Sequence, residues 1–112
     1  ENIYPEEIES VINSFRYVVE SLVVEQKGRL VAMVHLNRDE LEQRYHQLRD
    51  QAGRRVDDVE RRIDEVLHEL KAYVNSRVNK FSQIHVVIHS PEPFIKTATQ
   101  KIKRFLYQDR GS

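Results

Sequence analysis

Apolar residues near the start of the chain recur three and four positions apart, from residue 4 to residue 15. This spacing predicts a short helix with one apolar face, because 3.6 residues make one helical turn. Pro5 suits the first turn, where the N–H that proline lacks would be unpaired in any case. The apolar stripe of this helix comprises Ile8, Val11, Ile12 and Phe15.

Two runs rich in β-branched residues follow, at residues 17–25 and 30–36. Such side chains fit the pleated surface of a sheet, so each run predicts a strand. Residues 26–29 separate the two runs, and Gly28 among them can take the positive φ of a tight turn. The pattern therefore predicts an antiparallel β-hairpin.

The middle of the chain is helical in pattern. Asn37 can cap a helix that has Glu40 in its first turn, and Gly53 is expected to end or kink that helix. A long amphipathic helix is then predicted, reaching about 35 Å at ~1.5 Å per residue. Its apolar positions are Val56, Val59, Ile63, Val66, Leu67, Leu70, Val74, Val78 and Phe81.

The last third of the chain predicts one more strand, at residues 84–88, which the proline-containing segment 90–93 breaks. Residues 99–107 predict a short helix. We expect an α+β fold with a small antiparallel sheet of about three strands, on which helices pack, including the long amphipathic one. The residues expected to face inward from the final helix are Ile102, Phe105 and Leu106.

Composition narrows the class of protein. The 112 residues suffice for one domain, and the 18 basic and 18 acidic residues give a net charge of zero. This balance does not favour wholesale binding to nucleic acid. The charge is uneven, however, because five basic residues and one acidic residue follow position 95.

The absence of cysteine excludes disulfides, thiolate catalysis and cysteine metal sites, and it fits a cytoplasmic location. No apolar run approaches the ~20 residues of a membrane-spanning helix, and no signal peptide is visible. The chain opens directly on a helix-start sequence without an initiator methionine. We therefore expect a piece of a longer polypeptide.

Three kinds of site are not expected. His85 and His89 are four apart in a predicted strand, where four residues span about 13 Å, too far for one metal ion. The three glycines, Gly28, Gly53 and Gly111, form no phosphate-cradling loop. The basic tail lacks a zinc motif and an aromatic stacking platform, so we expect no nucleic-acid partner. It remains a candidate for holding an anion.

Both ends of the chain resemble motifs of one family. Residues 1–9, Glu-Asn-Ile-Tyr-Pro-Glu-Glu-Ile-Glu, resemble the segment that opens the C-terminal domain of adenylate-forming (AMP-binding) enzymes. Residues 95–104, Ile-Lys-Thr-Ala-Thr-Gln-Lys-Ile-Lys-Arg, resemble the closing motif of that domain, which usually reads Pro-Lys-Thr-x-x-Gly-Lys-x-x-Arg. This chain departs from the motif at Ile95, in place of proline, and at Gln100, in place of glycine.

The resemblance covers nearly the whole chain and is nearest to the long-chain fatty-acid–CoA ligase branch. It implies a lid domain that rotates between two steps of the parent enzyme. A fatty acid and MgATP give acyl-AMP and pyrophosphate, and the thiol of CoA then forms the thioester. By motif position, Lys101 corresponds to the adenylation lysine, and Asn2 would lie near the CoA tunnel. The N-terminal adenylating domain of the same polypeptide would hold most of the ATP and magnesium.

Alternatives stay open at this point. The acceptor could be a carrier protein instead of CoA, and the parent enzyme could associate peripherally with a membrane. The long helix could also form the dimer surface of a non-catalytic interaction module, although packing on the domain's own sheet is the simpler interpretation.

Overall fold

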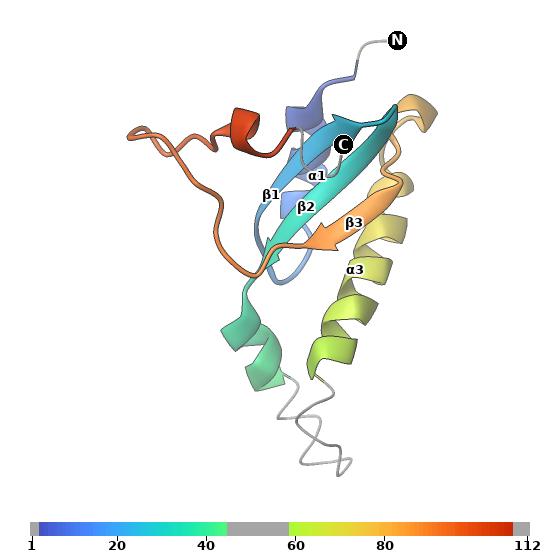
Figure 1. Cartoon of the computed structure of the whole chain (residues 1–112). Coiled ribbons are helices and arrows are strands. Elements are labelled where there is room, and N and C mark those ends of the chain that lie inside the picture. Colours follow the sequence, from blue (N-terminus) through green and yellow to red (C-terminus); the bar gives the residue numbers. More distant parts are fainter. Residues whose placement is uncertain (1–2, 45–58, 109–112) are drawn as a thin grey trace.

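The computed structural model describes residues 3–44 and 59–108, and Figure 1 shows how their elements are arranged. The described residues include two short 3₁₀ helices, Lys80–Ser82 and Arg104–Leu106, and a helical segment at residues 38–44. The main elements, in chain order, are α1 (Pro5–Asn13), β1 (Val18–Gln26), β2 (Arg29–Leu36), α3 (Val59–Asn75) and β3 (Val86–His89).

Strands β1 and β2 form the predicted antiparallel hairpin, in a register that pairs Gln26 with Arg29 at its closed end. Lys27 and Gly28 both have positive φ, 52° and 75°. Two such residues in a two-residue loop make a type I′ turn, whose twist matches that of the flanking strands. The hairpin prediction is confirmed, and the turn residues explain its register.

The third strand pairs with β2 in parallel, from Val31 opposite Val86 to Val34 opposite His89, so the strand order is β1-β2-β3. The α+β fold is confirmed, and the longer of the two pairings is antiparallel as predicted. The sheet is nevertheless mixed. A parallel pair needs a long crossover connection, and here the chain between β2 and β3 includes α3.

Helices α1 and α3 cover one face of the sheet (Figure 1). The apolar residues predicted for α3 within its bounds are buried in the domain's own core, which favours the packing interpretation over a dimer surface. No helix in the described ranges is long and apolar enough to cross a membrane. The buried residues of this core include Ile8, Ile12, Val23, Ala32, Val34, Ile63, Val66, Leu70, Val74 and Ile84.

Helix α3 ends at Asn75, six residues before the predicted end at Phe81. At this end the side chain of Asn75 bonds to the backbone of Ile84: its amide donates to the Ile84 carbonyl at 2.9 Å, and its oxygen accepts from the Ile84 N–H at 2.8 Å. These bonds fix the chain that returns toward β3 and leave Phe81 half exposed. The predicted positions Gly53 and Val56 lie outside the described residues.

The C-terminal segment covers the second face of the sheet. The inward-facing residues are Phe94 and Tyr107, which form a small second core with Leu22, Val24, Val31 and Met33. The predicted helix at 99–107 is therefore wrong, because only Arg104–Leu106 makes a 3₁₀ turn. Phe105, expected to face inward, is 70% exposed.

Candidate functional site

A tight hairpin carries Lys101. An antiparallel bridge joins Lys96 to Ile102, the Thr97 N–H donates to the Lys101 carbonyl at 2.8 Å, and the Gln100 N–H donates to the Thr97 carbonyl at 2.9 Å. These bonds define a three-residue loop, 98–100, of the kind that ends in a left-handed residue. In Figure 1 the tip of this segment projects away from the sheet (orange to red).

The loop needs a left-handed residue at position 100, and Gln100 supplies it with a φ of 68°. A residue with a side chain adopts this conformation at a cost of about 1–2 kcal/mol, whereas glycine adopts it freely. This accounts for the glycine that the resembling motif usually has there. The Thr97 hydroxyl supports the loop by accepting from the Lys101 N–H at 3.2 Å.

Lys101 is exposed, and no described residue makes a hydrogen bond or ion pair with its ammonium group. It lines an open hollow of about 690 Å³ at the surface. An ammonium group that is free of protein partners can meet an anionic ligand there. The hollow is lined by Glu6, Thr97, Gln100, Lys101, Ile102, Lys103, Arg104 and Phe105.

Arg104, the last residue of the motif, is fastened to α1. Its guanidinium donates to both carboxylate oxygens of Glu9, at 2.7 and 2.6 Å. Glu9 is 7% exposed and also accepts from the Val23 N–H of β1 at 2.8 Å. The hydrogen bond with Glu9 raises the pKa of Arg104, against a smaller opposing effect of burial. Arg104 is therefore a tether, and its charge is neutralised.

A second carboxylate fastens the other end of the hairpin. Glu20 of β1 pairs with the Lys96 ammonium at 2.8 Å and accepts from the Phe94 N–H at 2.7 Å. Lys96 also donates to the Phe94 carbonyl at 3.1 Å. Although Lys96 belongs to the basic segment, its charge is neutralised by the protein.

Tyr107 makes a third attachment. The Ile95 N–H donates to the Tyr107 hydroxyl at 2.9 Å. The rings of Phe94 and Tyr107 meet edge to face with centroids 5.2 Å apart, a favoured geometry for aromatic pairs. Because both rings are buried on the sheet, the hairpin is held from both ends and Lys101 is presented on a fixed support.

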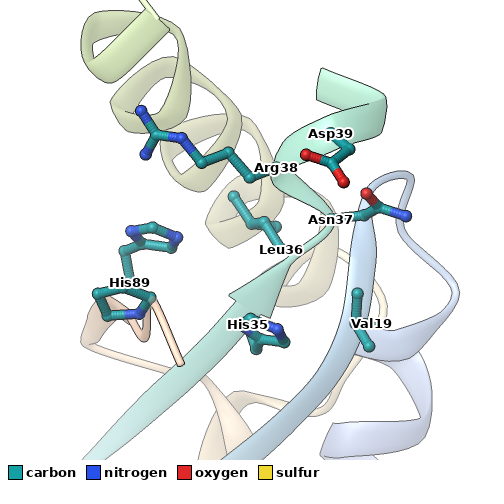
Figure 2. A pocket seen from close by; sticks show the side chains of 8 residues that line it. Val19, His35, Leu36, Asn37, Arg38, Asp39 and His89 are labelled. Carbon is teal, nitrogen blue, oxygen red and sulfur yellow. The ribbon is translucent and has the colours of Figure 1, made fainter. Parts of the chain in front are cut away.

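A separate pocket of about 250 Å³ lies where β2 and β3 end, and Figure 2 shows it. The ring of His35 bonds through Nδ1 to the Ser90 carbonyl at 2.9 Å. Burial lowers the pKa of His89. Arg38 extends toward α3, where it pairs with Glu60 at 2.8 Å, and it also pairs with Glu42 at 2.9 Å. Because His35 and Arg38 pair with other residues of the protein, we assign this pocket no ligand.

Of the predicted site residues, Lys101 lies in the hollow, whereas Asn2 lies outside the described residues. Among the described histidines, aspartates and glutamates, no three are grouped so that they could hold a metal ion. The sequence pattern did not reveal Glu9 and Glu20 as tethers. One signal was present for Glu9, an acidic residue between the apolar positions Ile8 and Ile12.

No family model matches this chain, and no curated protein does. Several solved structures, however, are similar to this chain. The ATP-bound RpMatB-BxBclM chimera B1 is similar with a TM-score of 0.62 and 25% identity, over 95% of this chain and 18% of the chimera. A Mycobacterium tuberculosis fatty acyl CoA synthetase matches with a TM-score of 0.61 and 22% identity, over 95% of this chain and 17% of the synthetase.

A benzoate CoA ligase from Burkholderia xenovorans LB400 also matches, with a TM-score of 0.61 and 24% identity, over 94% of this chain and 18% of the ligase. The chain thus spans less than a fifth of the length of these solved chains. The likeness establishes that it has the fold of one domain of acyl- and aryl-CoA ligases.

Proposed function

We propose that this chain is the C-terminal lid domain of an ATP-dependent acid–CoA ligase and that Lys101 is its adenylation lysine. The observation that carries the proposal is the position of Lys101 on a tethered hairpin, with its ammonium group open to a surface hollow. The fold likeness to CoA ligases supports the same class. The motif resemblance of residues 1–9 and 95–104 agrees with it.

The first reaction joins a carboxylate oxygen of the acid to the α-phosphorus of ATP, and pyrophosphate leaves. Negative charge on the phosphate oxygens increases in the transition state, so a cation held beside them lowers the barrier. A lysine suits this task, because its ammonium is a compact charge with three donors. Magnesium, when bound by the remainder of the enzyme, would neutralise further phosphate charge.

The tethers explain how this residue could act without reorganisation. Glu9 and Glu20 hold the two ends of the hairpin through Arg104 and Lys96. Catalytic groups that are positioned before the reaction spend no free energy on ordering during it. With the charges of Arg104 and Lys96 neutralised, Lys101 and Lys103 are the remaining cations of the motif beside the hollow, and Lys101 is the one at the motif position of the adenylation lysine.

For the acid substrate we propose a long-chain fatty acid, with CoA as the acceptor. The sequence Thr-Gln-Lys-Ile-Lys-Arg at residues 99–104 is similar to the fatty-acid branch, and a fatty acyl CoA synthetase is among the structural relatives. On this proposal the domain's partner is the N-terminal adenylating domain of the same polypeptide, in the cytoplasm.

The test uses the full-length parent enzyme with Lys101→Ala. Fatty-acid-dependent ATP–pyrophosphate exchange should fall on the order of a hundredfold, the usual effect of removing one charge-stabilising group. Thioester formation from preformed acyl-AMP should survive. Lys80→Ala is the matched control, because Lys80 is an exposed lysine outside the hollow. Unchanged exchange in the Lys101→Ala enzyme would overturn the proposal.

A further inference from the structure

Gln100 directly precedes Lys101, and its backbone has a conformation that is unfavourable for a residue with a side chain. Its φ of 68° lies in the left-handed region, which glycine adopts without steric cost. Among the other residues, asparagine and aspartate adopt this region more often than most. Glutamine has no local hydrogen bond to offer in return. Backbone strain at a candidate site motivates the hypothesis that the side chain of the strained residue has a function there.

The bonds of the loop do not involve the side chain of Gln100: among the described residues, the hydrogen bonds that close the loop use other groups. Gln100 is exposed, and no described residue makes a hydrogen bond with its carboxamide. The hydrogen bonds that close the loop use the backbone of Gln100 and the backbone and hydroxyl of Thr97. A glycine at position 100 would make the same backbone bonds at a lower conformational cost.

Gln100 does line the hollow that Lys101 lines. An amide NH₂ offers two donors, and phosphate oxygens accept from neutral donors as well as from cations. Of the three other cations of the motif, Arg104 pairs with Glu9 at 2.6 Å and Lys96 with Glu20 at 2.8 Å, whereas Lys103 lines the hollow together with Lys101. Gln100 directly precedes Lys101 in the chain and brings a neutral donor to the same hollow.

We propose that the Gln100 carboxamide is a second anion-binding group, which donates to a phosphate of ATP while Lys101 supplies the charge. This inference rests on the proposed function, because it needs a phosphate ligand in the hollow. It assigns to this chain a substrate contact that a glycine at the same place could not make.

The experiment compares two variants of the full-length parent. Gln100→Gly removes the carboxamide and relieves the backbone, whereas Gln100→Ala removes the carboxamide and keeps a side chain at positive φ. We expect both variants to lose about tenfold in kcat/KM for ATP in fatty-acid-dependent pyrophosphate exchange, as for the loss of one hydrogen bond to a charged group. In the 112-residue chain, the Gly substitution should also raise Tm by roughly 4 °C.

Lower activity together with a higher Tm cannot arise from partial unfolding, so the Gly variant separates a ligand contact from a structural role. Full activity in both variants would overturn the inference, as would a loss in Gly alone, which would indicate loop geometry. Lys101→Ala is assayed in parallel. If it abolishes exchange while both Gln100 variants stay active, the proposed function stands and this inference fails. If Lys101→Ala is active, the proposed function fails and this inference with it.

Discussion

The carboxylate of Glu9 and the guanidinium of Arg104, 95 positions apart in the sequence, form a doubly hydrogen-bonded ion pair with distances of 2.7 and 2.6 Å. Glu9 belongs to α1 and Arg104 ends the motif that carries Lys101. Since Glu9 also accepts from Val23 of β1, one buried carboxylate joins a helix, a strand and the C-terminal segment.

Replacing Glu9 with glutamine should destabilise the domain by about 2–3 kcal/mol. Breaking a fully buried pair costs ~3–5 kcal/mol, and the effect is smaller here because the Arg104 side chain stays about one third exposed. Urea denaturation of the chain measures the change. Glu7→Gln, on the exposed side of the same helix, should stay within ~0.5 kcal/mol. Equal stability of the Glu9 variant and the unaltered chain would contradict a structural role for the pair.

Glu20→Gln should loosen the segment around residues 94–96 more than the core. The carboxylate accepts from the Phe94 N–H and pairs with Lys96, and a weakened partner leaves a buried N–H poorly satisfied, at about 1–2 kcal/mol. Amide hydrogen exchange should become faster at residues 94–107, while α3 keeps its protection. Glu25→Gln, exposed on the same strand, serves as the control. Uniformly faster exchange would mean global destabilisation instead of local release.

Ile95→Pro, which restores the usual motif residue, should destabilise this particular chain. The Ile95 N–H donates to the Tyr107 hydroxyl at 2.9 Å, and proline has no N–H to donate. We expect a loss of about 1 kcal/mol, the typical net value of one hydrogen bond, measured by thermal unfolding. Ile95→Val keeps the N–H and should be nearly neutral, because Ile95 is 54% exposed. A stabilised proline variant would show that the hydroxyl contact contributes little.

Acidification below pH 6.5 should lower stability through His89. Burial holds the pKa of this imidazole below 6.5, its value in an unfolded chain. Between the folded pKa and 6.5 the unfolded chain binds a proton that the folded chain does not, so protons favour unfolding. The contribution is fully present above pH 6.5, decreases as the pH falls below that value, and is lost once the pH has fallen through the lower, folded pKa.

The charges around His89 modify the burial effect without reversing it. Glu60 and Asp64 raise the pKa, whereas His35 and Arg38 lower it. We expect a decrease in Tm on the order of 2 °C between pH 7 and 5.5, because the imidazole is only partly buried. His89→Gln should remove this dependence. His85→Gln, on an exposed neighbour, should retain it. An unchanged profile in the His89 variant would assign the dependence to other groups.

Local patterns predicted the elements whose stability is local. The stripe of α1 and the turn at Lys27 and Gly28 depend on residues within a few positions, so the sequence alone was sufficient for both. The sequence alone did not predict the parallel pairing of β3 or the end of α3. The pairing joins distant segments, Val31 with Val86, and the bonds of Asn75 with Ile84 span nine positions, more than a helical or strand period covers.

The C-terminal segment shows the same division. The predicted short helix placed Phe105 inward, but the burial of Phe94 and Tyr107 decides which side faces the sheet. Position 101 came from motif resemblance, and its role stays a prediction. The Glu9–Arg104 tether had no local signature, because no sequence period relates two residues 95 positions apart.

The tethering of both hairpin ends has a mechanical consequence. The ammonium of Lys101 has the reach of its own side chain and little more, since the backbone beneath it is clamped through Glu20 at one end and Glu9 at the other. On the proposed function, bringing this charge to a phosphate or withdrawing it requires the sheet and its helices to turn as one body. The projecting hairpin then works as a lever arm, so that a modest turn near α1 becomes a large displacement at its tip.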